Sequence, residues 1–173
     1  AETGTSGLDG EVEGFAVTGG MDRALDGGAI IGAMASYSST ENSLDSGLGQ
    51  ADIDGGSVGL YGYMPLPSRS FIDGHVSYGS YSVDTMRGVS VGPSSLAANG
   101  DTDATQLLAG VNIGREFQLD NGANVTPSLG LLHADYEIDG YTETGSSIAL
   151  DIASRDLTST QISVGATVDW EMG

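Results

Sequence analysis

The sequence predicts an all-β protein whose strands form an antiparallel up-and-down meander. Apolar and polar residues alternate with a period of two in seven stretches, whereas the 3.6-residue spacing of a helix is nearly absent. The 28 glycines fall mostly inside apolar runs and not in linkers, which indicates strands that bend or are approached closely. Short, turn-rich connections alternate with longer ones, as expected when consecutive strands are neighbours.

The seven alternating stretches are each expected to form one strand. In chain order they are residues 13–21, 29–39, 57–64, 70–83, 105–117, 124–138 and 159–171. The stretch LDIASRDLTSTQIS, beginning at Leu150, is the closest approach to a helical pattern, but alternation fits it equally well. We expect one domain over 1–173, with residues 1–12 as an N-terminal loop.

Each stretch has an apolar face and a face of small or polar residues. The apolar faces are, strand by strand, Phe15, Val17 and Met21; Ile31, Ala33, Ala35 and Tyr37; Val58 and Leu60; Ile72, Val76 and Tyr78; Leu107, Ala109, Val111 and Ile113; Val125, Leu129 and Leu131; and Ile162, Val164, Ala166 and Val168. The opposite faces include Gly59, Tyr61, Asp73, His75, Asn112 and Asp169.

The connections predict a sheet with two unlike ends. Residues 22–28, 64–70 and 118–124 read as short turns, whereas 39–56, 84–103 and 138–153 read as long, acidic or small-residue loops. An outer-membrane β-barrel has this asymmetry, with one strand face toward lipid and the other toward a polar lumen. A water-soluble sandwich or barrel would alternate in the same way, so both remain open on the pattern alone.

Aromatic residues lie near the ends of the expected strands, where an interfacial girdle would place them. They are Phe15, Tyr37, Phe71, Tyr78, Phe117 and Trp170.

Composition excludes several functions. The net charge of −19, with five arginines and no lysine, opposes nucleic-acid binding. The absence of cysteine excludes disulfides and thiolate chemistry. No run approaches the ~18 apolar residues of a transmembrane helix, and no signal peptide is visible at the start.

No residue pattern predicts an enzyme or a cofactor site. The two histidines, His75 and His133, lie on different expected strands, and the GxSxG motif is missing. The strongest candidates for weak calcium binding are aspartate pairs beside glycine, although solvated acidic loops are the simpler interpretation. These pairs are Asp52 with Asp54 and Asp101 with Asp103.

Two arginines stand out in this acidic chain. Arg87 and Arg115 could pair with carboxylates such as Asp73 or Asp169, or lie free on the surface.

Three parts of the sequence carry a further pattern: VTPSLGLLHADYEIDGYTETG, the later STQISVGATV, and SVGLYGYM followed by FIDGHVSYGSYSVDTMRGV. In their order and spacing these segments resemble the autotransporter β-domain of Gram-negative bacteria. The similarity covers roughly residues 11–171, and its signal comes from the order and spacing of degenerate motifs.

The resemblance implies a twelve-stranded outer-membrane barrel that accompanies a secreted passenger to the cell surface. It also implies a helix preceding the barrel that threads its pore and a terminal aromatic residue that serves the barrel-insertion machinery. This sequence departs on all three points, with about seven strands, no helix before Glu13 and an end at DWEMG. Seven strands form an open sheet, which closes with strands from elsewhere, closes with a second copy, or pairs edge to edge in water.

The function implied is a non-enzymatic outer-membrane module of protein secretion, in contact with lipid and with the insertion machinery. The residues expected to face lipid are Ile31, Ala33, Val58, Leu60, Val111, Ile113, Val164 and Val168, and those expected to line the interior are Gly59, Tyr61, Asp73, His75, Asn112 and Asp169. The alternative is an extracellular β-rich structural protein that self-assembles through its edge strands into a filament or matrix.

Overall fold

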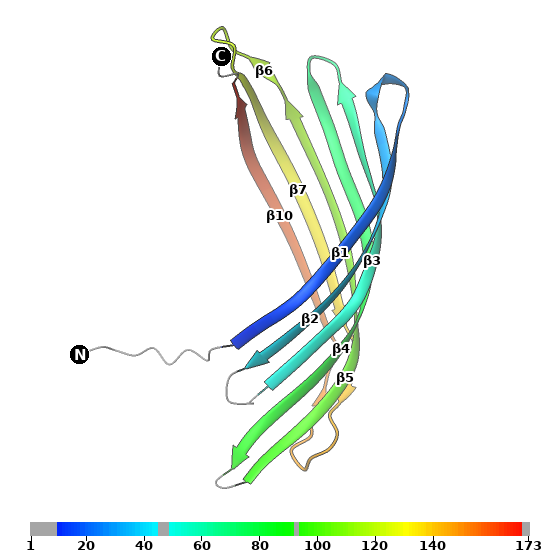
Figure 1. Ribbon diagram of the computed structural model, residues 1–173, viewed down its shortest axis with the longest axis vertical. Helices are drawn as coiled ribbons and strands as arrows, with labels where there is room; N and C mark the ends of the chain where they lie inside the picture. Colours follow the sequence, from blue (N-terminus) through cyan, green and yellow to red (C-terminus); the bar gives the residue numbers. More distant parts are fainter. Residues whose placement is uncertain (1–9, 45–48, 92–93, 171–173) are drawn as a thin grey trace, which may run out of the picture.

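Seven long antiparallel strands dominate the computed structural model, which describes residues 10–44, 49–91 and 94–170 (Figure 1). They are β1 (Gly10–Ala24), β2 (Ile30–Leu44), β3 (Gly49–Leu66), β4 (Ser70–Val91), β5 (Ser94–Arg115), β7 (Asn124–Ile138) and β10 (Arg155–Asp169). Their order in the sheet is β1-β2-β3-β4-β5-β7-β10, and every pair is antiparallel. The predicted all-β meander is confirmed, because the long strands lie in the described sheet in the same order as in the chain.

Three short strands complete the fold. β6 (Phe117–Gln118) pairs with the start of β7, and β8 (Tyr141–Thr142) pairs with β9 (Asp151–Ile152) in a separate hairpin. A 3-10 turn, η1 (Asp26–Gly28), joins β1 to β2. Within the described ranges, no helix is long and apolar enough to cross a membrane.

The short connections lie together at the upper end of the sheet in Figure 1, as predicted. Glycine is required in two of them, because Gly27 has φ of 83° and Gly122 has φ of 85°, a left-handed conformation that other residues adopt at a cost. These tight turns fix the antiparallel register of each strand pair at this end.

Two of the three expected long loops are strand wherever the structure describes them, so those predictions were wrong there. Residues 45–48 and 92–93 of these loops, residues 1–9 of the expected N-terminal loop and residue 171 of the last expected strand lie outside the described residues. β2 and β3 remain paired as far as Leu44 and Gly49, and β4 and β5 remain paired as far as Val91 and Ser94. These segments carry Ser, Thr, Asp and Gly on both faces, so the apolar alternation that identifies a strand is absent. Main-chain pairing with the neighbour nevertheless continues, because it satisfies N–H and C=O groups along both segments.

The structure also tests the predicted bounds of three other segments. β1 begins at Gly10, so the predicted N-terminal loop is strand over residues 10–12. The stretch from Leu150 forms β9 and β10, in agreement with alternation and not with a helix. Residues 138–153 remain mostly loop, as expected, apart from the β8–β9 hairpin.

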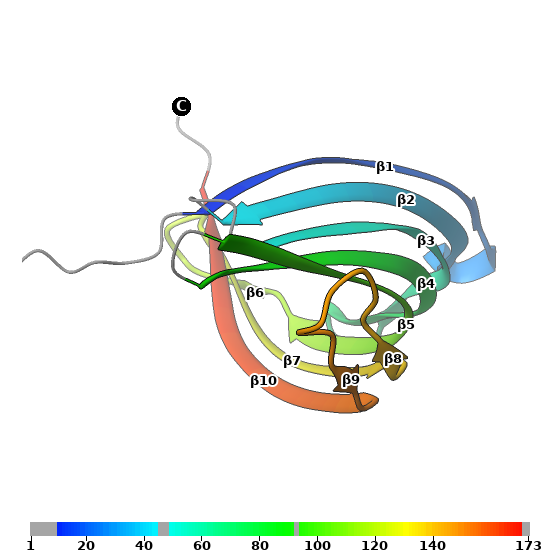
Figure 2. The same ribbon diagram turned by 90° about the horizontal axis from the view of Figure 1, so that it is seen from below.

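The sheet curves into an open arc, with β1 and β10 as its two edges (Figure 2). Side chains at even positions of β5 are less exposed than those at odd positions, because the concave face crowds the residues that point into it. Apart from four glycines, only Ala98, Ala123, Ala134 and Glu143 are buried among the described residues, so the sheet has no packed hydrophobic core of its own. Its apolar residues are exposed instead.

Candidate functional site

A continuous apolar band covers the convex face of the sheet. The ladder places four alternating, mostly apolar positions on each of the seven long strands. Strand by strand they are Phe15, Val17, Gly19 and Met21; Ile31, Ala33, Ala35 and Tyr37; Val58, Leu60, Gly62 and Met64; Ile72, Gly74, Val76 and Tyr78; Leu107, Ala109, Val111 and Ile113; Val125, Pro127, Leu129 and Leu131; and Ile162, Val164, Ala166 and Val168. All eight residues expected to face lipid lie in this band.

The band is exposed to an extent that water does not favour. Val58 is 64% exposed and Val164 is 83% exposed, and most large side chains of the band are similar. Monomeric soluble proteins rarely carry contiguous apolar patches of this extent. The band is therefore a surface made to meet lipid or another protein.

The band drifts across the hydrogen-bond ladder from one edge to the other. The uppermost band residue of β1 is Met21. The row of directly paired residues that starts at Met21 ends on β10 at Thr160, whereas the uppermost band residue of β10 is Val168. The drift is thus eight residues over six strand-to-strand steps. At about 3.3 Å per residue and about 4.8 Å between strands, this slope corresponds to strands tilted by roughly 40° against the band, which is the tilt of a membrane β-barrel.

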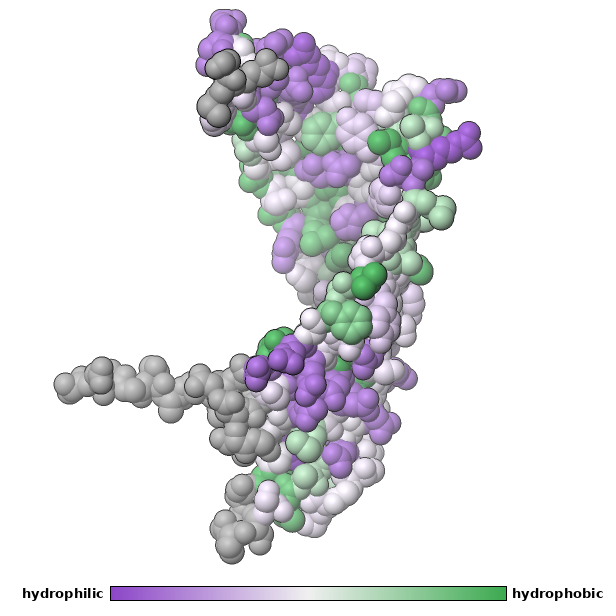
Figure 3. Space-filling model, in the orientation of Figure 1, coloured by the Kyte–Doolittle hydropathy of each residue, from purple (hydrophilic) through white to green (hydrophobic). Residues whose placement is uncertain are grey.

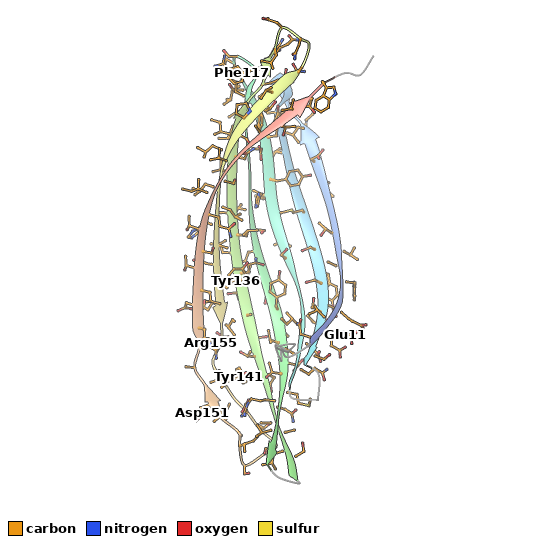
Figure 4. All side chains as sticks on the ribbon, turned by 90° about the vertical axis from the view of Figure 1, so that its left-hand side faces the viewer. Glu11, Phe117, Tyr136, Tyr141, Asp151 and Arg155 are labelled. Atoms are coloured by element: carbon orange, nitrogen blue, oxygen red, sulfur yellow. The ribbon has the colours of Figure 1, made fainter. Side chains whose placement is uncertain are left out.

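Charged residues lie beyond both margins of the band. Below it, the long extensions of the strands are acidic, and hydrophilic side chains gather over the lower ends of β1 and β2 (Figure 3). The labelled Glu11, Asp151 and Arg155 lie in this lower half, whereas Phe117 lies at the opposite end (Figure 4). Arg23 and Arg115 lie on the convex side at the upper margin, since Arg23 pairs with Ile31 and Arg115 follows Ile113 by two.

The concave face carries all six residues expected to line the interior. Tyr61, Asp73, His75 and Asn112 are neighbours on β3, β4 and β5. Asn112 donates a hydrogen bond to Asp73 (Nδ2–Oδ2, 3.0 Å), and the Tyr61 hydroxyl donates one to Asp22 of β1 (3.1 Å).

The other two interior residues lie apart from this group. Gly59 lies one step below Tyr61, and Asp169 lies on the far strand β10, opposite Asn124.

Aromatic rings of the concave face lie over glycines of adjacent strands. The Tyr61 ring occupies the place of a side chain at Gly32, and the His75 ring does so at Gly110. Phe71 covers Gly114 in the same way. A side chain at any of these glycines would collide with a ring, so the glycines allow large polar and aromatic residues to lie flat against the wall.

The predicted aromatic girdle is only partly present. Phe15 and Tyr37 lie on the convex face with ring centroids 6.0 Å apart, and Phe117 lies 4.9 Å below the Arg115 guanidinium. Phe71 belongs to the concave face, because it shares the parity of Asp73, so its assignment to the girdle was wrong. Its ring stacks on Tyr63 at 5.9 Å.

The β8–β9 hairpin docks on the concave side of the β4–β5 extension through an ion pair. Arg87 donates two hydrogen bonds to the carboxylate of Glu143, one of them from Nε at 3.0 Å, and a third to the carbonyl of Ile148 at 2.9 Å. The Leu150 amide donates to the same carboxylate at 3.0 Å, and Glu143 is 5% exposed. The Tyr141 ring covers Gly100 beside this pair.

This cluster was missed by sequence reasoning. Arg87 was expected to pair with Asp73 or Asp169 or to lie free, and Arg115 lies against Phe117 instead of a carboxylate. Arg87 and Glu143 are 56 residues apart, and only the fold of the third loop brings them together. The one available signal was an isolated arginine in an acidic chain.

The four calcium candidates lie in strands and not in loops. Asp52 and Asp54 of β3, and Asp101 and Asp103 of β5, are on the convex face below the apolar band. Residues two apart in an extended strand cannot wrap around one ion. Among the described residues, no three His, Asp or Glu side chains are placed to hold a metal, and calcium binding stays a prediction.

Two of these aspartates, Asp52 and Asp101, instead belong to a row of directly opposed carboxylates. Each residue of the row is the ladder partner of the next, across β1 to β5: Glu13, Glu41, Asp52, Asp84 and Asp101. Like charges in directly opposite positions destabilise a sheet. The row is thus a destabilising feature of the strand extensions.

The two histidines lie on opposite faces and share no site. His75 is on the concave face, whereas His133 of β7 is on the convex face, where it contacts Thr160 at 2.9 Å and Asp135 at 3.0 Å.

The comparisons with known proteins agree with this geometry. The family model "Autotransporter beta-domain" matches residues 1–173. The chain belongs to the autotransporter β-domain family. The predicted family, the all-β barrel-type fold and the bacterial outer-membrane localisation are thereby confirmed.

Two solved structures are similar to this chain. The translocator domain of autotransporter NalP from Neisseria meningitidis matches with a TM-score of 0.78 and 19% identity, over 95% of this chain and 56% of that one. The chain thus spans about half of the NalP domain. The β-domain of the Bordetella autotransporter BrkA matches with a TM-score of 0.32 and 16% identity, over 95% and 90% of the two chains. A search of curated proteins found no match.

Acid should release the β8–β9 hairpin. The Arg87 guanidinium, by hydrogen bonding, holds the pKa of Glu143 below its ordinary value. The stabilisation by this pair is therefore complete above about pH 4.3 and is lost as pH falls through the lowered pKa. Because the chain has no cysteine, a spin label at Ser147→Cys can report hairpin mobility in EPR spectra between pH 2.5 and 7.

The variant Glu143→Gln should show a mobile hairpin at every pH, and Asp151→Asn, which alters an exposed hairpin carboxylate outside the pair, should behave like the parent. A label that is equally immobile in Glu143→Gln and in the parent would contradict the role of the ion pair.

Removing the central charge of the carboxylate row should stabilise the protein. Asp84 opposes both Asp52 and Asp101, so Asp84→Asn removes two repulsive pairs, and we expect the melting temperature to rise by about 1–3 °C. Millimolar calcium or magnesium should raise the melting temperature of the parent more than that of the variant. Asp26→Asn, in the upper turn, is the matched control, and an equal or lower melting temperature of Asp84→Asn than of the parent would refute the repulsion.

Proposed function

We propose that this chain forms part of the wall of an outer-membrane translocator barrel that accompanies export of a passenger to the cell surface. The observation that carries the proposal is the two-faced sheet, in which one apolar band crosses seven strands at the tilt of a membrane barrel while the other face is polar. The family match over the whole chain supports the same function.

The direction of insertion follows from the ends of the sheet. Outer-membrane barrels have short periplasmic turns and longer extracellular segments. The upper turns of this sheet are short, and the lower strand extensions and the β8–β9 hairpin are long. The upper end is therefore periplasmic in our proposal, and the acidic extensions project from the cell.

The concave face suits a translocation path. Its hydroxyl, amide and carboxylate groups can exchange hydrogen bonds with a passing chain, as Ser36 and Ser57 do with each other at 2.7 Å. Glycines such as Gly32 and Gly110 let the aromatic residues lie against the wall, which keeps the interior wide. The chemistry required is passage and not bond cleavage, so the proposed function is non-enzymatic and uses no cofactor.

Assembly needs partners for both sheet edges. β1 and β10 pair with no further strand among the described residues, and unpaired N–H and C=O groups in lipid cost several kcal/mol each. We propose that strands of the same barrel pair with them after delivery by the barrel-insertion machinery. Edge pairing into an extracellular filament would satisfy the same groups, but would leave the apolar band in water.

The parity of β5 gives a direct test. Val111 lies in the middle of the apolar band and Asn112 is its neighbour on the concave face. Val111→Arg should abolish membrane assembly, since arginine near the bilayer midplane costs about 2–4 kcal/mol, whereas Asn112→Arg should assemble normally. The measurement is recovery of a heat-modifiable, detergent-requiring species from the outer-membrane fraction, and equal tolerance at both positions would count against a lipid-facing band.

A water-soluble polymer with sheets continuous between subunits would instead support the filament.

A further inference from the structure

The apolar band is hollowed over β1 to β5. One hollow of about 630 Å³ lies over Gly19, Ala33 and Ala35, and a second of about 500 Å³ lies over Gly62 and Gly74, which are direct ladder partners. Both hollows are shallow, wide open to the surroundings and lined almost entirely by apolar atoms. The two hollows share the side chains of Leu60 and Val76 as a common wall.

The small residues lie at one depth in the band. Counted from the upper margin, the second position is small on each of the first four strands: Gly19, Ala33, Gly62 and Gly74. The position above each is large: Met21, Ile31, Met64 and Ile72. Because the strands are tilted against the band, the small residues lie at one level although their ladder positions differ. They form a recess just below the rim of large residues, in the half of the band nearer the short turns.

Nothing in the described part of the chain fills this recess. No atom lies within 4 Å of a side chain built at Gly19, and only the backbone oxygen of Ile30 does so at Gly62. Glycines of the concave face behave differently, since rings such as Tyr61 over Gly32 and Phe71 over Gly114 cover them. At Gly74 the nearest atoms are backbone atoms of Gly110 and Val111, so these glycines of the recess meet no side chain, whereas rings cover Gly32 and Gly114.

The charges around the recess favour a lipid over a second copy of the chain. Arg23 lies directly above Met21 at the upper margin, beside Ile31, which lines the second hollow. It is exposed and has no hydrogen-bond or ion-pair partner among the described side chains. Below the recess lies the row of carboxylates from Glu13 to Asp101, which in a symmetric contact through this face would oppose its own copy.

We propose that the recess binds one glycerophospholipid with an anionic head group. Its acyl chains lie in the two hollows against Gly19 and Gly62, and its phosphate lies against Arg23, in the leaflet at the short-turn end. A guanidinium beside an apolar groove matches both parts of such a lipid. This inference rests on the membrane placement in the proposed function.

The test compares lipids on the folded, detergent-solubilised protein by native mass spectrometry. The probes are phosphatidylglycerol and phosphatidylcholine with identical acyl chains. The parent should retain one phosphatidylglycerol, with an affinity about five-fold higher than for phosphatidylcholine. Arg23→Gln should abolish this preference while phosphatidylcholine binding persists.

Filling the hollows should weaken binding of both lipids. We expect a loss of at least about five-fold for Gly62→Leu, and independently for Gly19→Leu, where the space is open. The matched control is Ala166→Leu, which places the same side chain on the convex face of β10, away from the recess.

Three results would overturn the proposal. They are equal affinity of the parent for both lipids, unchanged binding in both glycine variants, and a dimer of the parent that Gly62→Leu dissociates. If the parent is heat-modifiable and membrane-bound but retains no lipid, only the lipid site fails. If the parent does not partition into the membrane at all, the proposed function itself fails.

Discussion

The continuous antiparallel hydrogen-bond ladder is the constraint on which every other feature of this sheet depends. Directly paired residues share a face, so the register at one turn fixes the face of every residue across seven strands. A slip of one residue at β3 would move Val58 and Leu60 to the concave side and Gly59 and Tyr61 to the convex side. The separation into an apolar and a polar face therefore rests on main-chain pairing and not on a packed core.

Because each residue is fixed to one face and the sheet has no packed core, the glycines have different roles on the two faces. On the concave face they receive rings of neighbouring strands, which supply packing that a soluble protein would obtain from a second layer. On the convex face they leave recesses that the surrounding medium has to fill. The stability of the sheet thus depends on the surrounding medium as well as on the chain. The edges at β1 and β10, which have no partner among the described strands, add a need for strands that pair with them.

Alternation was a sufficient guide wherever one face was apolar, which is why the spans from Phe15 to Met21 and from Leu107 to Ile113 were predictable. It gave no signal in residues 39–56 and 84–103, where both faces are polar, and the sequence therefore read as loop. Strand extension there is driven by pairing between two segments that are equally polar, so neither segment reveals it alone. Phe71 was misplaced for a related reason, because its neighbours near a turn allow either parity.

The sequence by itself determined the number of long strands, their antiparallel order and the division of residues between two faces, since a period of two is a local property of the chain. Only the tertiary structure decided the curvature of the sheet, the pairing of Arg87 with Glu143 and the recess above Gly62 and Gly74. These features depend on contacts between residues of different strands and of a folded-back loop. Such contacts cannot be read from the positions of the residues along the chain.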